Sequence, residues 1–184
     1  MSAALMRGAD LIGQPVVDAA TGNDLAEVRD VVFDTRLGSI TGFTLRKRGF
    51  LGRRMKNVLA IGSVLSVGTH AVMVDGAESL SHPDEAPDDV AADKGSDVLH
   101  DQVITESGRS LGAVRDVIVM GGSSPRVVGF QIGGGAVGDG LVPIASQTGV
   151  SGSALIVPDR YEERIRTDLT GFAAELASLE GDPS

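Results

Sequence analysis

The chain repeats Val28-Arg29-Asp30-Val31-Val32-Phe33 as Val114-Arg115-Asp116-Val117-Ile118-Val119, 86 residues further on. It also repeats Ile40-Thr41-Gly42-Phe43-Thr44-Leu45 as Val127-Val128-Gly129-Phe130-Gln131-Ile132, at an offset of 87 residues. A period of this length indicates a duplicated domain, because solenoid repeats span about 20–50 residues. Apolar residues stand at matching positions in both copies, so the duplication preserved a core.

Each copy has the pattern of short strands separated by turn residues. Runs of β-branched residues are bounded by Gly, Asn and Ser at regular spacing, which predicts antiparallel sheets that close into small barrels. The 25 glycines in 184 residues exceed the usual share of about 7 %. The expected strands are 14–18, 25–34, 40–46, 58–61 and 71–75 in the first copy, and 102–105, 111–120, 126–132, 141–144 and 154–157 in the second.

Four segments follow from this pattern: a barrel-like domain over 8–77, a linker over 78–97, a second barrel-like domain over 98–158 and a helix over 159–180. The linker contains two prolines and several acids with few large apolar residues, which favours a solvated, flexible connection.

The last segment changes to a helical period. Asp159 and Glu162 form a candidate capping pair at its start. The apolar stripe either packs on its own domain or pairs with the helix of a second chain. The stripe consists of Tyr161, Ile165, Leu169, Phe172, Leu176 and Leu179.

Composition limits the classes of partner and the compartment. The net charge of −9 argues against a general nucleic-acid coat. There is no cysteine for a disulfide or a thiolate metal site. The N-terminus lacks the apolar run of a signal peptide, and no stretch approaches the ~18 uninterrupted apolar residues of a membrane span. We therefore expect a soluble, cytoplasmic protein.

No motif supports catalysis, so we predict no catalytic residues, no cofactor and no metal. The stretch Gly133-Gly134-Gly135-Ala136-Val137-Gly138 matches G-x-G-x-x-G but leads into a strand-like sequence, whereas a dinucleotide site needs a helix there. His70, His82 and His100 lack the spacing of metal ligands. The repeated Arg-Asp pair is expected to point its two side chains to opposite faces of a strand, in a structural role.

A basic stretch is the strongest candidate for a partner-binding site. Residues 46–56 hold six of the sixteen Lys and Arg residues, and the second copy has no basic counterpart. Three interpretations are open: a solvated hairpin loop, a contact with the chain's own acidic linker, or a docking site for an acidic protein, RNA or an anionic membrane surface. The candidate partner-binding residues are Arg46, Lys47, Arg48, Phe50, Leu51, Arg53, Arg54 and Lys56.

The two copies resemble the PRC-barrel superfamily, named after the photosynthetic reaction-centre H subunit, over about residues 8–76 and 96–158. The resemblance implies a small, strongly bent β-barrel that acts by protein contact, without known catalytic residues. Relatives include the C-terminal half of a ribosome maturation factor and the cytoplasmic cap of the reaction centre. The matching pieces are Asp10-Leu11-Ile12-Gly13, Leu25-Ala26-Glu27-Val28-Arg29-Asp30-Val31, Gly42-Phe43, Gly49-Phe50-Leu51-Gly52, Val58-Leu59-Ala60-Ile61 and Leu141-Val142-Pro143-Ile144.

Together these features predict a non-enzymatic adaptor built from two PRC-like barrels. The alternative is an RNA- or ribosome-associated assembly factor that uses the 46–56 loop, and nuclease-sensitive, salt-dependent retention would favour it. A third class, a small-molecule or nucleotide-binding regulator, predicts thermal stabilisation by its ligand. A homodimer through the C-terminal helix is a further expectation.

Overall fold

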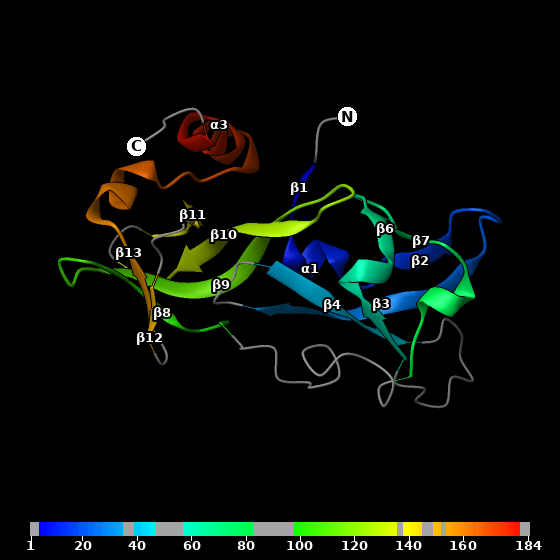
Figure 1. Cartoon of the computed structure of the whole chain (residues 1–184). Coiled ribbons are helices and arrows are strands. Elements are labelled where there is room, and N and C mark those ends of the chain that lie inside the picture. Colours follow the sequence, from blue (N-terminus) through cyan, green and yellow to red (C-terminus); the bar gives the residue numbers. More distant parts are fainter. Residues whose placement is uncertain are drawn as a thin grey trace. The chain divides into compact units, whose positions relative to one another are not determined.

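A computed structural model of the chain describes residues 4–34, 39–46, 57–82, 98–135, 138–144, 149–151 and 154–180 (Figure 1). Residues 83–97, which form most of the expected linker, lie outside the described residues. The chain divides into two units. Unit 1 comprises Met1–Ser96 with Met120–Arg126, and unit 2 comprises Asp97–Val119 with Val127–Ser184.

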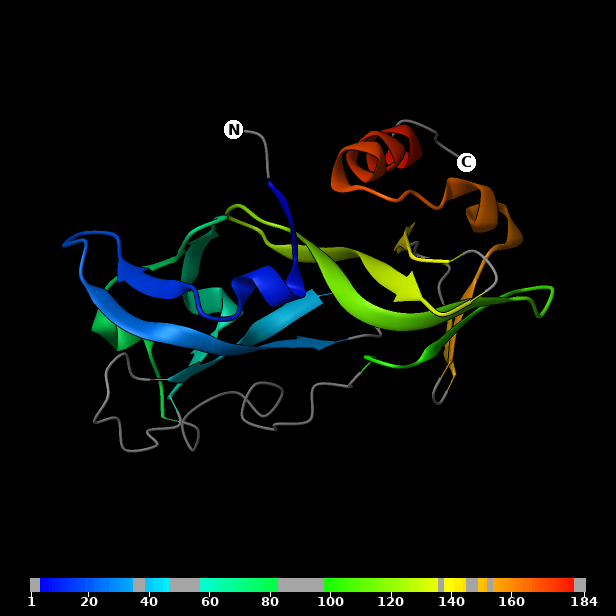
Figure 2. The same ribbon diagram turned by 180° about the vertical axis from the view of Figure 1, so that it is seen from behind.

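Unit 1 is built on a curled sheet in which the strands pair in the order β5-β4-β3-β2-β7-β6. Neighbours are antiparallel except for the parallel pair β2 and β7. The short helix α1 packs on β3 (Figures 1 and 2). The elements are β1 (Leu5–Arg7), α1 (Gly8–Leu11), β2 (Pro15–Asp18), β3 (Asp24–Asp34), β4 (Ser39–Arg46), β5 (Asn57–Ala60), the 3-10 helix η1 (Ile61–Ser63), β6 (Val64–Val67), β7 (Val72–Val74) and the 3-10 helix η2 (Ala77–Ser79).

Unit 2 repeats this order as β11-β10-β9-β8-β13-β12 and adds a C-terminal helix. Again one pair, β13 and β8, is parallel. The elements are β8 (Gln102–Thr105), β9 (Ser110–Met120), β10 (Arg126–Gly133), β11 (Gly140–Pro143), β12 (Gly149–Ser151), β13 (Ala154–Val157), the 3-10 helix η4 (Asp159–Arg164) and α3 (Leu169–Glu180).

The strand registers of the two copies are the same. Val16 pairs with Val72 in the first copy, and the corresponding Val103 pairs with Leu155 in the second. The antiparallel pairs β2–β3 and β8–β9 also shift register at the same point, after Val16 and after Val103. The duplicated, mainly β fold is therefore confirmed, and the two copies share this irregularity.

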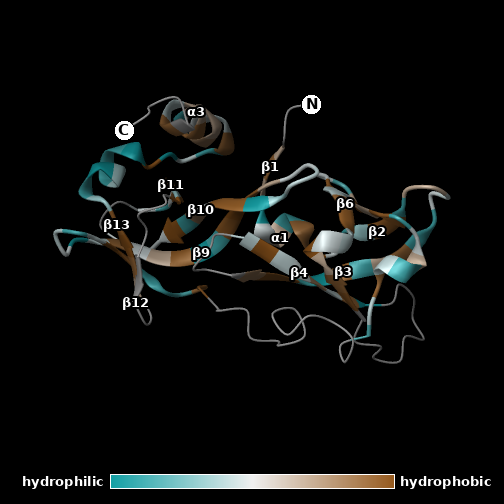
Figure 3. Cartoon of the chain, viewed as in Figure 1, coloured by the Kyte–Doolittle hydropathy of each residue, from teal (hydrophilic) through white to brown (hydrophobic). Residues whose placement is uncertain are grey.

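Apolar side chains alternate inward along the strands, as the period of two requires. Figure 3 shows the hydrophobic residues concentrated on the strands, while hydrophilic residues are frequent at the turns. The largest fully buried side chains include Phe43, Leu59 and Leu11 in unit 1 and Ile118 and Ile132 in unit 2. The sequence pattern missed three short strands, β1, β6 and β12, because three or four residues give too little periodicity.

The expected continuous helix over 159–180 is wrong in its first half. A 3-10 helix runs from Asp159 to Arg164, and Arg166 then forms an antiparallel bridge with Leu141 of β11. The α-helix begins at Leu169, where Asp168 Oδ1 accepts a hydrogen bond from the Gly171 amide at 2.8 Å. The C-terminal helix is thus confirmed only over α3.

The helix α3 packs on its own unit. The Phe172 ring is fully buried and lies so close to Gly129 of β10 that a Cβ there would overlap it. The buried Glu175 carboxylate binds Arg164 at 2.7 Å and Arg166 at 2.5 Å. This apolar contact and the ion pairs hold the helix to the segment before it.

Candidate functional site

Arg46 is the described member of the predicted basic site. Its guanidinium is exposed and forms an ion pair with Glu27, to which Nε donates a hydrogen bond at 2.8 Å. The two residues are cross-strand partners on β4 and β3, so their pairing follows from the register. The other predicted residues, Lys47, Arg48, Phe50, Leu51, Arg53, Arg54 and Lys56, lie outside the described residues.

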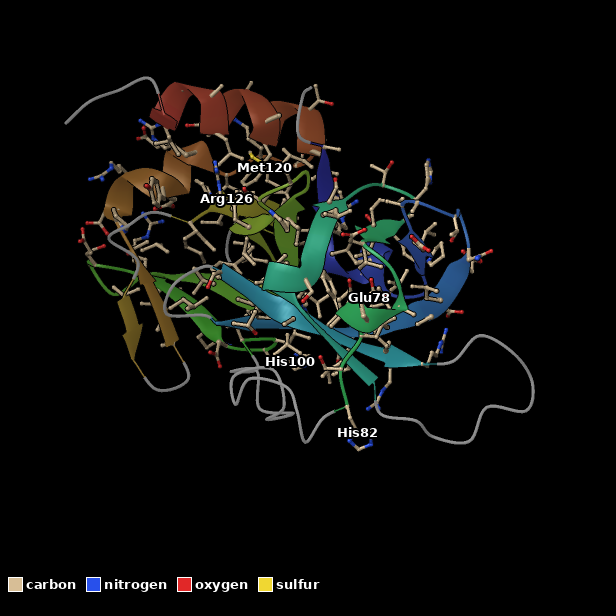
Figure 4. The ribbon with its side chains drawn as sticks, turned by 45° about the vertical axis from the view of Figure 1, so that its right-hand side comes forward. Glu78, His82, His100, Met120 and Arg126 are labelled. Atoms are coloured by element: carbon tan, nitrogen blue, oxygen red, sulfur yellow. The ribbon has the colours of Figure 1, made fainter. Side chains whose placement is uncertain are left out.

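The two ends of the basic stretch are fixed by strand pairing. The chain leaves β4 at Arg46 and enters β5 at Asn57, whose backbone pairs with that of Leu45. Val58 exchanges two hydrogen bonds with Ser81, at 3.1 and 3.0 Å. His82, which follows Ser81, is exposed (Figure 4). The basic stretch and the acidic segment after residue 82 are therefore joined to one strand, β5.

The corresponding connection in the second copy is the glycine stretch between β10 and β11. A Cβ on Gly135 would lie 2.5 Å from the backbone nitrogen of Gly112, and a Cβ on Gly112 would lie 2.8 Å from the Gly133 oxygen. Gly134 also requires a positive φ of 76°. These glycines allow two backbone segments to touch. Because strand β11 follows at Gly140 rather than a helix, the G-x-G-x-x-G match has a packing explanation.

The repeated Arg-Asp pair forms a β-bulge in the first copy. The register shifts between Val28 and Asp30, and Asp30 Oδ1 accepts a hydrogen bond from the Val31 amide at 2.9 Å. Arg29 and Asp30 are both exposed, so the expectation of opposite faces is wrong, because a bulge breaks the alternation of side chains. Asp116 makes the same bond to Val117 at 2.8 Å.

In each copy, one carboxylate binds the backbone of the first turn. The sequence pattern did not predict this role. Hydrogen bonds from the Thr21 hydroxyl, at 2.5 Å, and the Ala20 amide, at 2.9 Å, lower the pKa of Asp18. In the second copy, a hydrogen bond from the Ser107 amide, at 3.0 Å, lowers the pKa of Asp159. Asp18 ends a strand just before a Gly-containing turn, so its role could have been predicted from the sequence. The role of Asp159 could not, because its partner Ser107 is 52 residues away.

Asp159 and Glu162 are not a helix cap. Asp159 binds the turn after β8, as described above, and Glu162 forms an ion pair with Arg109 of the same turn at 2.8 Å. Both acids therefore attach the 3-10 helix η4 to the β8–β9 turn.

The three histidines are exposed and none lies within a metal-ligand cluster. Among the described residues, no group of three or more His, Asp or Glu side chains could hold a metal ion. Within the same residues, no helix is long and apolar enough to span a membrane. The described geometry thus offers turn-holding carboxylates and the two strand ends, Arg46 and Asn57, between which the basic stretch lies in the sequence.

These features define a class of protein: a tandem of curled β-domains with the same register. The PRC-barrel domain model matches residues 4–80 and again residues 92–164, so the chain belongs to the PRC-barrel family. Domains of this family are generally non-catalytic. No curated protein matches the sequence significantly.

Proposed function

We propose that the chain is a non-enzymatic adaptor that binds an acidic protein through the 46–56 loop. The observation that carries this proposal is a difference between two otherwise matched connections. The pairs Gly42–Ala60 and Gly129–Pro143 show that β4–β5 and β10–β11 share one register.

Between these matched strands, the first copy has ten residues, 47–56, and the second has six, 134–139. The ten residues contain five Lys or Arg, whereas the six contain none. A barrel of this family therefore closes this connection without basic residues, as the second copy does. Extra cations that the fold does not need raise the local positive potential and favour an anionic partner.

The ion pair of Arg46 supports the same emphasis on residues 47–56. The charge of Arg46 is matched by Glu27 within the sheet, so Arg46 is already paired and the proposal rests on the five cations that follow. Phe50 and Leu51 stand between the two groups of cations, so the loop carries apolar residues that a protein partner buries and an electrostatic contact alone does not use. Aromatic residues are scarce in the chain, with five Phe, one Tyr and no Trp, which disfavours base stacking.

The test compares two double charge reversals with equal change in net charge. One is R53E/R54E in the loop, and the control is R29E/R115E at the two exposed arginines of the repeated Arg-Asp pair. Affinity capture from lysate of the source organism, with quantitative mass spectrometry and a salt series, should show an acidic protein retained by wild type and by the control but lost from the loop variant. Purified partner should then bind with the same ranking.

Three outcomes would replace the proposal. Retention that is lost on nuclease treatment favours the RNA- or ribosome-associated alternative. Loop-dependent binding to vesicles with anionic lipid, but not to neutral vesicles, assigns the loop to a membrane surface. Equal capture by all three proteins shows that the loop is solvated surface.

A further inference from the structure

The segment Met120–Arg126, whose two end residues are labelled in Figure 4, joins β9 to β10 and belongs to unit 1. The Gly121 amide donates a hydrogen bond to the Ala4 carbonyl at 2.9 Å. Gly122 and Val67 exchange two more, at 2.8 and 2.9 Å. Residues 4 and 67 of the first copy are therefore joined through two glycines that the second copy supplies.

The contact is shaped for glycine. A Cβ on Gly121 would lie 2.5 Å from the Val67 carbonyl oxygen and 2.8 Å from Met6 Cε. The Val67 oxygen belongs to the backbone of a residue that is 1 % exposed, so it cannot move aside without disturbing the core. Gly122 adopts a φ of +106°, which side-chain-bearing residues rarely adopt.

The far end of the segment is attached to unit 1 as well. Arg126, the first residue of β10, pairs with Ser39, the first residue of β4. Met120–Arg126 is thus held at its start by Ala4 and Val67 and at its end by β4. Three of these interactions are backbone hydrogen bonds, which fix position more strictly than side-chain contacts do.

We infer that unit 1 carries a binding slot, formed by Ala4, Met6 and Val67, whose occupant is the two-glycine turn of Met120–Arg126 of the same chain. The slot makes three backbone hydrogen bonds of the first copy depend on glycines that the second copy supplies. It also holds residues 1–82 and 98–184 together by a contact that does not pass through residues 83–97. This inference is independent of the 46–56 loop.

The experiment places a specific protease site within residues 84–93 of the full chain and cleaves the folded protein. Size exclusion with light scattering at low micromolar concentration should show the two fragments eluting together at the mass of one chain, 18.9 kDa. Separate elution of the wild-type fragments under native conditions would overturn the inference.

A matched pair of glycine variants shows whether the slot is responsible. Gly121→Ala adds one methyl group against the Val67 oxygen, whereas Gly62→Ala in η1 adds it where nothing lies within 4 Å. The two fragments of cleaved G121A should dissociate at concentrations at which those of cleaved G62A stay associated. The dissociation constant of the G121A fragments should be at least tenfold higher. Equal retention of the two variants would contradict the slot.

Amide hydrogen exchange of the uncleaved chain covers the case in which G121A folds poorly. In wild type the Val67 and Gly122 amides should exchange as slowly as those of the core strands, because each donates a hydrogen bond. Fast exchange of both amides in an otherwise protected unit 1 would show that the slot is empty in solution.

Discussion

The two copies stabilise the same turn with carboxylates from different elements. One carboxylate lies directly before the turn, and the other lies after the last strand of its copy. In the first copy, Asp18 at the end of β2 binds the turn that follows it. In the second copy, the matching position is Thr105, and Asp159, which follows the last strand, reaches back to Ser107. The turn needs an acceptor for its amides, and the residues at the C-terminal end of either strand of the parallel pair can supply it.

The copies also differ after their last strand. Ser81 bridges Val58 of β5 in the first copy, and Arg166 bridges Leu141 of β11 in the second. After this shared bridge the second copy forms α3 and buries Phe172, whereas the first continues into the acidic segment. The two domains therefore carry different additions after the same bridge.

The largest expected effect comes from removing the anchor of α3. Phe172→Ala should destabilise unit 2 by about 3–5 kcal/mol, as truncation of a fully buried aromatic ring does, because Phe172 is 0 % exposed. Urea unfolding, with amide exchange resolving the two units, measures the loss. Leu179→Ala, a half-buried position on the same helix, should cost clearly less. If Phe172→Ala lowered the stability no more than Leu179→Ala, the packing of α3 would not depend on the Phe172 ring.

The next effect tests one turn position in both copies. Gly13 and His100 both adopt a positive φ, of 89° and 77°, and their amides bond Val28 and Val114 respectively. A residue with a Cβ costs about 1 kcal/mol in this region, so His100→Gly should stabilise the chain and Gly13→Ala should destabilise it by similar amounts. The nearest neighbour of a Cβ on Gly13 lies 3.8 Å away, so the backbone alone sets the effect.

Thermal melting of the two variants against wild type gives the signs. If His100→Gly is neutral or destabilising, the histidine side chain makes a compensating contact and the comparison between copies fails at this position.

Much of this fold is readable from the sequence, and the misses have physical causes. Most strands of both copies, the β class and α3 follow from the hydrophobic period, whereas β1, β6 and β12 were missed. The bulge at Arg29 does not follow from it, because Val31, Val32 and Phe33 are all apolar, so the sequence does not show which of them continues the inward alternation. The break before Leu169 was missed because Tyr161 and Ile165 keep helical spacing while Arg166 pairs with a strand 25 residues earlier.

The candidate site was less predictable than the fold. The charge of residues 46–56 is visible in the sequence, but the ion pair of Arg46 depends on the register of β3 against β4. The place of Gly121 and Gly122 in unit 1 rests on hydrogen bonds to residues far away in the sequence, and no local pattern carries such a signal.

A smaller effect concerns the dependence on pH of the two turn carboxylates. Both pKa values are lowered in the folded state, so each carboxylate stabilises the fold above its ordinary pKa near 4. That contribution is lost as the pH falls through the lowered folded value. The stability difference between wild type and Asp18→Asn, or Asp159→Asn, should be constant from pH 7 to about 5 and shrink towards pH 2.

Chemical denaturation across that range measures the difference. Glu106→Gln, at an exposed position of the β8–β9 turn, serves as the control. A difference that grows as the solution becomes more acidic would contradict the assigned direction of the pKa shifts.

The smallest expected effect concerns Arg46 and Glu27, the ion pair at the start of the basic loop. The Arg46 side chain is 57 % exposed and that of Glu27 16 %, so solvent screens the pair, and a double-mutant cycle with R46A and E27A should give a coupling of only about 0.2–1 kcal/mol. The coupling should fall in 1 M salt, since the pair is largely on the surface. A pair that weak contributes little to holding the sheet, which agrees with the proposal that a partner binds the five cations that follow. Coupling well above this range would instead make Arg46 a structural residue of β4, and R46A would then be unsuitable as a binding variant of the loop.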